Sequence, residues 1–152
     1  MSQVKRFEDY CWHDNAIHAF RMVQGADGCT GDLVLDIDHI VEWLSPPENA
    51  TAYHFRLAPA LLTFHEVSDL VVSIDYGAHS LAFQPMAIHD IRREEVTYPN
   101  GYTSFAWTIE LNIPMAGHMT FHASGFTQTV NSESVVSRMQ SLSPSQRGSL
   151  LL

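Results

Sequence analysis

Histidine and carboxylate side chains crowd the stretch CWHDNAIHAF, residues 11 to 20. His13 and His18 are five positions apart, which places them on opposite faces of a strand and about 140° apart around a helix, so neither geometry lets them chelate one ion. Asp14 and His18 are four apart and share a face in either geometry, which lets the carboxylate orient or charge the imidazole. We therefore expect a hydrogen-bonded pair of Asp14 and His18 at the start of a strand.

A second group of acidic side chains lies in LVLDIDHIVEW, residues 33 to 43. Strict alternation puts Asp36, Asp38 and Glu42 on one strand face and His39 on the other, among the leucines. Three carboxylates on one face have the chemistry to bind Ca²⁺ or Mg²⁺, or to form an acid and base pair if burial raises one pKa. The favoured interpretation is instead a solvated polar face, with His39 buried and satisfied by hydrogen bonds.

The best hairpin in the sequence spans TSFAWTIELNIPMAGHMTFHASGFTQTV, residues 103 to 130. If Pro114 to Ala116 forms the loop, Leu111 lies opposite Met119 and Trp107 opposite Ala123. All four side chains then share one apolar face, whereas a slip of one residue mixes the faces, so this register is predicted.

The polar face of this hairpin collects a carboxylate and two imidazoles. Glu110, His118 and His122 form a set of the 2-His-1-carboxylate kind that binds divalent metals. The leading interpretation has no cofactor, and a divalent metal at this set, or at Asp36 and Asp38, is the alternative. No GxSxG motif or nucleophile context accompanies these residues, so no catalytic residue is assigned.

The elements that must position these side chains are strands. Period-two alternation predicts them over residues 33–43, and GADGCTGD, residues 25–32, predicts a hairpin loop to an earlier strand over 16–24. SPPENAT, residues 45–51, predicts a loop, and Pro59 indicates an edge strand or a bulge. Further expected elements are strands over 53–66 and 70–76, a strand over 86–96 with a short helix as the alternative there, and a helical turn near 135–140.

These elements predict an all-β fold, an antiparallel sandwich or partly open barrel of seven or eight strands with a short helical or irregular C-terminal segment. We expect one antiparallel domain over residues 1–131 and a Ser-rich C-terminal tail over 132–152. The 152 residues, 45% hydrophobic and only 16% charged, are enough to bury a real core and exclude a disordered chain.

The charge of the chain excludes some partners. Eight Lys and Arg against seventeen Asp and Glu give a formal net charge of −9, which predicts no nucleic-acid binding and is compatible with a basic protein partner. Cys11 and Cys29 are the only cysteines and have no CxxC spacing, so reduced thiols are expected, with a bridge between them left open. A charged N-terminal stretch and the lack of a long apolar run predict no membrane insertion and a cytoplasmic location, with the oligomeric state undetermined.

Several stretches taken together carry a resemblance. WHDNAIH, LVLDIDHIVEW, TFHEVSDL, AIHDI, WTIELNIP and FHASGFTQ resemble a group of small uncharacterised bacterial β-meander proteins, some of which are assigned as immunity proteins of toxin systems. The resemblance covers roughly residues 10 to 130 and implies no catalytic residues.

Three functions follow as hypotheses. The first is a non-enzymatic bacterial domain that binds another protein, in an immunity-like version a basic toxin domain neutralised by the acidic chain. The second is a metal-binding or metal-dependent β-barrel enzyme. The third is a small-ligand binding barrel, which requires Trp12, Trp43 and Trp107 to line an interior cavity rather than fill it.

Overall fold

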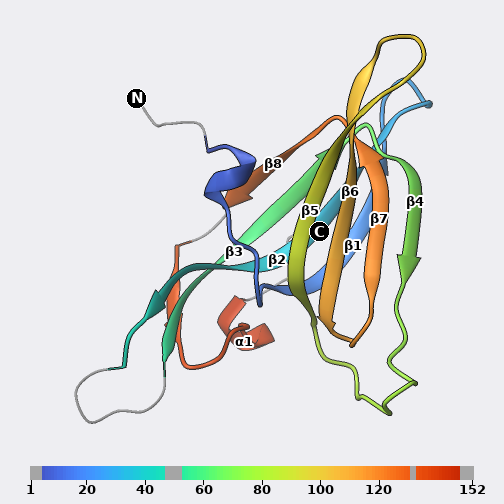
Figure 1. The fold of residues 1–152 in the computed structure, drawn as a ribbon. Helices are drawn as coiled ribbons and strands as arrows, with labels where there is room; N and C mark the ends of the chain where they lie inside the picture. Colours follow the sequence, from blue (N-terminus) through green and yellow to red (C-terminus); the bar gives the residue numbers. More distant parts are fainter. Residues whose placement is uncertain (1–4, 47–52, 131–132, 148–152) are drawn as a thin grey trace.

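The computed structural model describes residues 5–46, 53–130 and 133–147. In these ranges nine antiparallel strands form one open sheet, flanked by two short helices (Figure 1). An all-β, antiparallel, open sandwich-like fold is therefore confirmed, with one strand more than expected. The elements in chain order are η1 (Phe7–Asp9), β1 (Ala16–Gln24), β2 (Gly31–Leu44), β3 (His54–His65), β4 (Ser68–Ser73), β5 (Met86–Thr97), β6 (Thr103–Ile113), β7 (His118–Ala123), β8 (Gly125–Val130), β9 (Val135–Ser137) and α1 (Pro144–Arg147).

The sheet is nearly split into two halves between β5 and β1. Hydrogen bonds give the order β4-β7-β6-β5-β1-β2-β3-β8, with β9 also on β3. The pairing of β1 with β5 is limited to Ala16 with Ala87 and Ile17 with Met86. In Figure 1 the half containing β5, β6, β7 and β4 accordingly crosses in front of β1 and β2. Side chains from both halves fill the core between them, among them Leu33, Leu35, Ile37, Phe64, Trp107, Ile109, Met119 and Phe121.

Helices contribute little to this architecture. Within the described ranges, neither η1 nor α1 is long or apolar enough to cross a membrane.

The β6–β7 hairpin keeps the predicted faces but not the predicted register. Trp107 pairs with Phe121 rather than with Ala123. The turn is also longer than expected. The hydrogen bond that closes it runs from the backbone N–H of Leu111 to the carbonyl of Gly117 at 2.9 Å, so residues 112–116 form the connection instead of 114–116. The shift is even, so the apolar side chains of both strands still point into the core.

The β1–β2 hairpin is confirmed, and it contains a bulge at His18. Ile17 pairs with Ile37 and Ala19 pairs with Asp36, so His18 is the extra residue on β1. A bulge re-aims the side chain of the extra residue and changes which residues share a face beyond it. Simple alternation from Asp14 therefore gives the wrong neighbours for His18.

Pro59 lies in β3, which is not an edge strand. On one side β3 pairs along its length with β2, and on the other it pairs with β9 at residues 55–57 and with β8 at residues 60–65. Pro59 falls between these two partners, where a missing N–H donor leaves no ladder bond unmade. A break in the neighbouring strands thus takes the place of the expected edge or bulge.

The C-terminal segment covers the face of β2 and β3 that points away from the core. Val135–Ser137 forms β9 against β3, so the helical turn predicted near residues 135–140 is wrong; the helix is α1 at Pro144–Arg147. Leu142 is 2% exposed and packs with Ile40, Phe55 and Leu57 in a second small apolar cluster. The boundary expected at 131 and 132 and most of the loop expected at 45–51 lie outside the described residues.

Aromatic side chains before β1 close one end of the core. The Arg93 guanidinium on β5 lies 4.5 Å from the ring centre of Phe7 and 4.3 Å from that of Phe105, so it is held between η1 and β6. The indole N–H of Trp12 donates to the side chain of Gln128 on β8 at 2.8 Å. These contacts attach the N-terminal segment to both halves of the sheet.

Candidate functional site

Asp14 and His18 do not pair with each other, so that expectation is corrected. Asp14 precedes β1 in a left-handed turn with φ of 65°, and its carboxylate accepts hydrogen bonds from Asn112 at 2.9 Å and Gln140 at 3.0 Å. His18, at the bulge, bonds instead through Nε2 to the carboxylate of Asp38 at 2.5 Å. The left-handed turn and the bulge both break the regular spacing on which the predicted pair depended.

Asp36 and Asp38 are not on a solvated face. Both are fully buried, and the Arg147 side chain, 3% exposed, lies between them. Its Nη2 donates to Asp36 at 2.6 Å and its Nε donates to Asp38 at 2.8 Å. The two carboxylates therefore form the internal anchor of the C-terminal segment.

The electrostatics of this anchor favour the charged forms. Burial acts to raise the pKa of Asp38, but hydrogen bonds from His18 and the backbone N–H of Leu142, together with the charge of Arg147, outweigh it and hold the pKa below its ordinary value. For Arg147, burial lowers the pKa, and the bonds and charges of the two carboxylates more than compensate and raise it. Asp36, Asp38, His18 and Arg147 therefore form a buried ion network within the chain.

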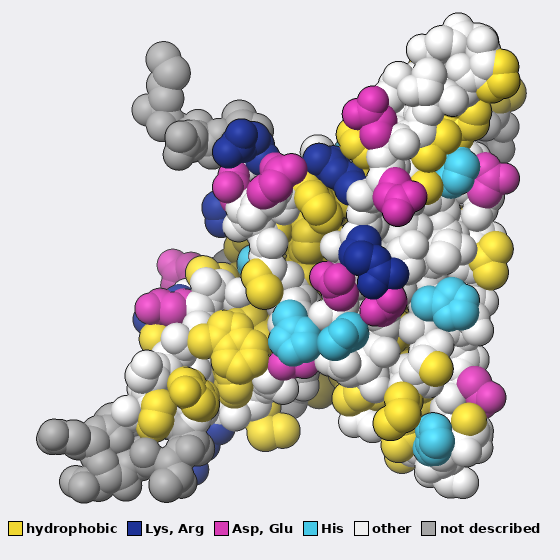
Figure 2. All heavy atoms as spheres, viewed as in Figure 1, with side chains coloured by type: hydrophobic (Ala, Val, Ile, Leu, Met, Phe, Trp, Pro, Cys, Tyr) yellow, Lys and Arg dark blue, Asp and Glu magenta, His cyan; other side chains and the backbone are white. Residues whose placement is uncertain are grey.

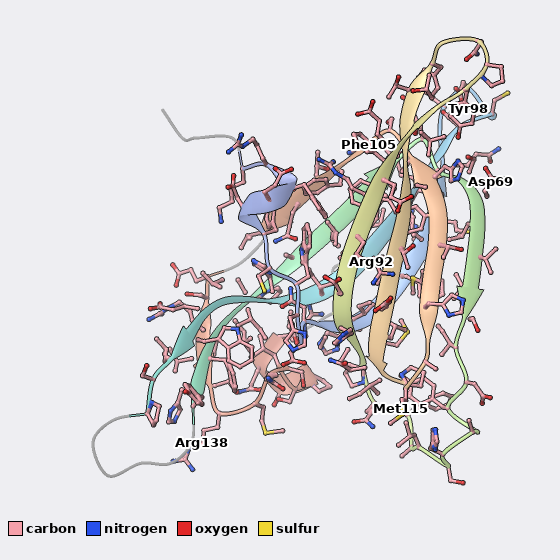
Figure 3. The ribbon with its side chains drawn as sticks, viewed as in Figure 1. Asp69, Arg92, Tyr98, Phe105, Met115 and Arg138 are labelled. Atoms are coloured by element: carbon pink, nitrogen blue, oxygen red, sulfur yellow. The ribbon has the colours of Figure 1, made fainter. Side chains whose placement is uncertain are left out.

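The proposed metal set on the β6–β7 hairpin is not assembled. Glu110 binds Arg92 at 2.6 Å on the outer face of β5 and β6 (Figure 3), His118 contacts a backbone carbonyl, and His122 hydrogen bonds with the Tyr98 hydroxyl at 2.6 Å. Across the described parts of the chain, no cluster of three or more His, Cys, Asp or Glu side chains could hold a metal ion. The metal hypothesis stays a prediction that this geometry does not favour.

His39 is buried and hydrogen bonded, as expected. The side-chain N–H of Asn15, a fully buried residue, donates to Nδ1 of His39 at 2.8 Å, and the side-chain oxygen Oδ1 of Asn15 accepts from the backbone N–H of Ile40 at 3.2 Å. Burial, with a smaller contribution from the charge of Lys5, lowers the pKa of His39 to about 4. A neutral imidazole with these partners has a structural role.

The tryptophans and cysteines that bear on function are also placed. Trp12 and Trp107 fill the core at 4% and 1% exposure, whereas Trp43 is 45% exposed and packs edge-on against Phe55. These tryptophans therefore do not line an interior ligand cavity. Cys11 and Cys29 are both free and exposed.

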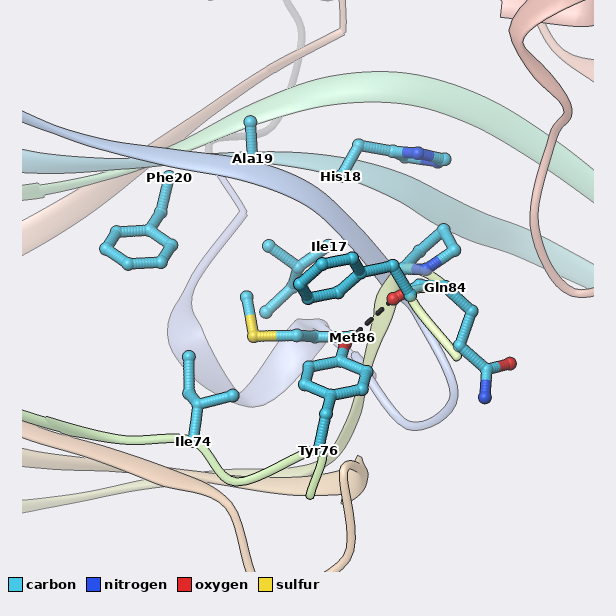
Figure 4. Close-up of a pocket in the computed structure, with 10 residues that line it drawn as sticks. Ile17, His18, Ala19, Phe20, Ile74, Tyr76, Gln84 and Met86 are labelled. Atoms are coloured by element: carbon cyan, nitrogen blue, oxygen red, sulfur yellow. Dashed lines mark hydrogen bonds between the residues drawn. The ribbon is translucent and has the colours of Figure 1, made fainter. Parts of the chain in front are cut away.

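A groove of about 800 Å³ lies between β1 and the segment that joins β4 to β5 (Figure 4). Ile17 and Phe20 of β1 point toward Ile74 and Tyr76 across it. The Tyr76 hydroxyl donates to the carbonyl of Gln84 at 2.8 Å, which fixes one wall. The lining is mostly apolar: Ile17, His18, Ala19, Phe20, Ile74, Tyr76, Phe83, Gln84, Pro85 and Met86.

A second hollow of about 350 Å³ continues along β1 from the first. Residues 22–24 of β1 and 31–33 of β2 line one side, and residues 67–70, at the start of β4, line the other. Together the two hollows form what we call the β1–β4 slit, bordered by residues 17–24 on one side and 67–76 on the other. Main chain closes both of its ends, where Val67 donates to the carbonyl of Gly31 at 2.8 Å and where Ile17 pairs with Met86.

Sequence reasoning did not find this slit. Phe83 lies in GAHSLAFQP, which reads as a connector, and Phe20 and Met22 read as ordinary strand residues. The available signal was the placement of the large apolar residues Phe20 and Met22 within one predicted strand and of Phe83 in a connector, where folding alone does not require them.

Comparisons of the chain with models of known protein families, with curated proteins and with solved structures find no match. The β1–β4 slit is therefore the candidate functional site.

Proposed function

We propose that this chain is a protein-binding domain and that the β1–β4 slit is its binding surface. The observation that carries the proposal is the exposure of large apolar side chains along the slit: Phe83 is 96% exposed, Met22 is 72% exposed and Phe20 is 38% exposed. A contiguous exposed apolar patch costs free energy in water and is typical of interaction sites.

The charge of the chain favours a basic partner. The formal net charge is −9, and Asp32 and Asp69 stand at the end of the slit next to the β1–β2 loop, with side chains 38% and 70% exposed. In Figure 2 basic side chains over β5 lie beside acidic ones, whereas no Lys or Arg is among the residues that line the slit end at Asp32 and Asp69. Complementary charge speeds association and selects among partners.

The resemblance to immunity proteins gives this proposal its most specific form. In that form the chain is a bacterial protein that holds a basic toxin domain at the slit and thereby neutralises it. The bound chain would inhibit the toxin by covering its surface, and no chemical reaction is needed for that.

The proposal is tested by affinity capture with matched variants. Phe83→Ser removes the most exposed apolar side chain of the slit, and Met139→Ser, at a residue 66% exposed in the C-terminal segment, is the control. We expect a protein from the native host to be retained by the unmodified chain and by Met139→Ser, to be lost with Phe83→Ser, and to be released by salt. Equal retention by all three chains would place the binding surface elsewhere.

A small apolar ligand is the second candidate, because about 800 Å³ is within the usual volume range of ligand sites. A ligand that copurifies with the chain, is lost with Phe83→Ser, and raises the melting temperature on re-addition would favour this function over protein binding.

A further inference from the structure

The backbone of β1 along the slit has no strand beside it. In the part of the chain that the structure describes, β1 pairs with β2 from Ala16 to Gln24, but pairs on its other edge only at Ala16 and Ile17. Beyond Ile17 that edge borders the slit. An unpaired edge presents a row of N–H and C=O groups that can pair with another strand.

The register shows which groups are free. Gly25 donates to the carbonyl of Thr30 at 2.7 Å, so this pair is hydrogen bonded. In an antiparallel ladder, hydrogen-bonded and non-hydrogen-bonded pairs alternate. The backbone N–H and C=O groups of Phe20, Met22 and Gln24 therefore point away from β2 and toward the slit.

The opposite border of the slit is a second free edge. Strand β4 pairs with β7, and no other described strand lies beside it. Residues 17–20 of β1 face residues 74 and 76, and residues 22–24 face residues 67–70, so β1 and β4 run in opposite directions along the slit. The gap in the sheet thus lies between two extended edges, with an apolar floor.

We propose, on the basis of the protein-binding function above, that the slit takes an extended segment of the partner protein as an added strand on β1, with alternate apolar side chains in the groove and a Lys or Arg beside Asp32 and Asp69. Main-chain hydrogen bonds supply affinity in this mode of recognition, and side-chain pockets supply specificity. The apolar groove at Phe20 and the two aspartates at the other end of the slit are pockets of these two kinds.

The test uses a synthetic peptide that alternates valine and lysine, titrated into the full chain. Met22→Pro removes the slit-facing N–H without breaking a bond to β2, and an edge strand tolerates proline at such a position. Met22→Ala loses the same apolar side chain but keeps the N–H, so it is the reference for the proline variant. We expect Met22→Pro to bind the peptide about tenfold more weakly than Met22→Ala.

A second measurement needs no variant. Amide exchange of Phe20, Met22 and Gln24 in the unmodified chain should slow when the peptide is added, since their N–H groups then donate to it. Three results together would overturn strand addition while leaving the slit as the binding surface. They are loss of peptide binding with Phe83→Ser, unchanged exchange rates of these amides when the peptide binds, and equal peptide affinities of Met22→Pro and Met22→Ala. Absence of peptide binding would overturn the proposal, as would protection of the same amides in a dimer without peptide.

Discussion

Replacing Arg147 by methionine tests whether the C-terminal segment is anchored as the structure indicates. The Arg147 side chain is 3% exposed, and its guanidinium bridges Asp36 and Asp38, which are fully buried, at 2.6 and 2.8 Å. Methionine fills a similar volume but leaves two buried carboxylates without their cation. Removing one partner of a buried ion pair costs about 3–5 kcal/mol.

That cost is large relative to the stability of a domain of this size, which is typically about 5–15 kcal/mol. It corresponds to a fall in melting temperature of roughly 6–20 °C. Urea unfolding followed by tryptophan fluorescence measures it, because Trp12 and Trp107 are buried in the native state. Arg138→Met, at an exposed position in the same segment, is the matched control and should cost less than about 0.5 kcal/mol.

A double-mutant cycle separates the ion pair from simple loss of packing. Asp36→Asn in the Arg147→Met background should cost less than Asp36→Asn alone, with a coupling of about 1–3 kcal/mol. An Arg147→Met chain as stable as Arg138→Met, together with additive effects in the cycle, would refute the buried network as the anchor.

Two further predictions concern other buried contacts. The pKa of His39 is about 4 in the folded chain and has its ordinary value of 6.5 in the unfolded chain, so the free energy of unfolding should decrease as the pH is lowered from 6.5 toward 4. His39→Gln should remove about 2 kcal/mol of the loss that urea titrations show between pH 7 and about pH 4.5. Identical pH profiles for the two chains would contradict this. Arg93→Met should cost about 1–2 kcal/mol in the same assay because it removes the cation from between Phe7 and Phe105, whereas Arg92→Met, at a half-exposed ion pair, should cost less; the reverse order would contradict the packing described.

The strands and the first hairpin of this chain could be predicted from its sequence, because neighbouring residues determine them. Alternation predicted the strands around residues 16–24 and 33–43, and the Gly- and Asp-rich stretch between them predicted their hairpin. The burial of His39 followed from the same alternation, because the leucines on its face had to point into the core.

The candidate site could not be read in this way because its determinants are not local. Asp36 looked solvated because its partner, Arg147, is 111 positions later in a Ser-rich segment without periodicity. His18 faces Asp38 only because a bulge shifts the register, and no feature of AIHAF marks that bulge. The slit depends on where β1 separates from β5, a property of how the two halves cross.

Hydrogen exchange of the complex with the captured partner shows whether the β1–β4 slit is where this chain binds a protein. We expect slower exchange on complex formation at residues 17–24 and 67–86, with residues 133–147 unchanged. Protection concentrated at residues 133–147, with the slit still exchanging as in the free chain, would contradict it.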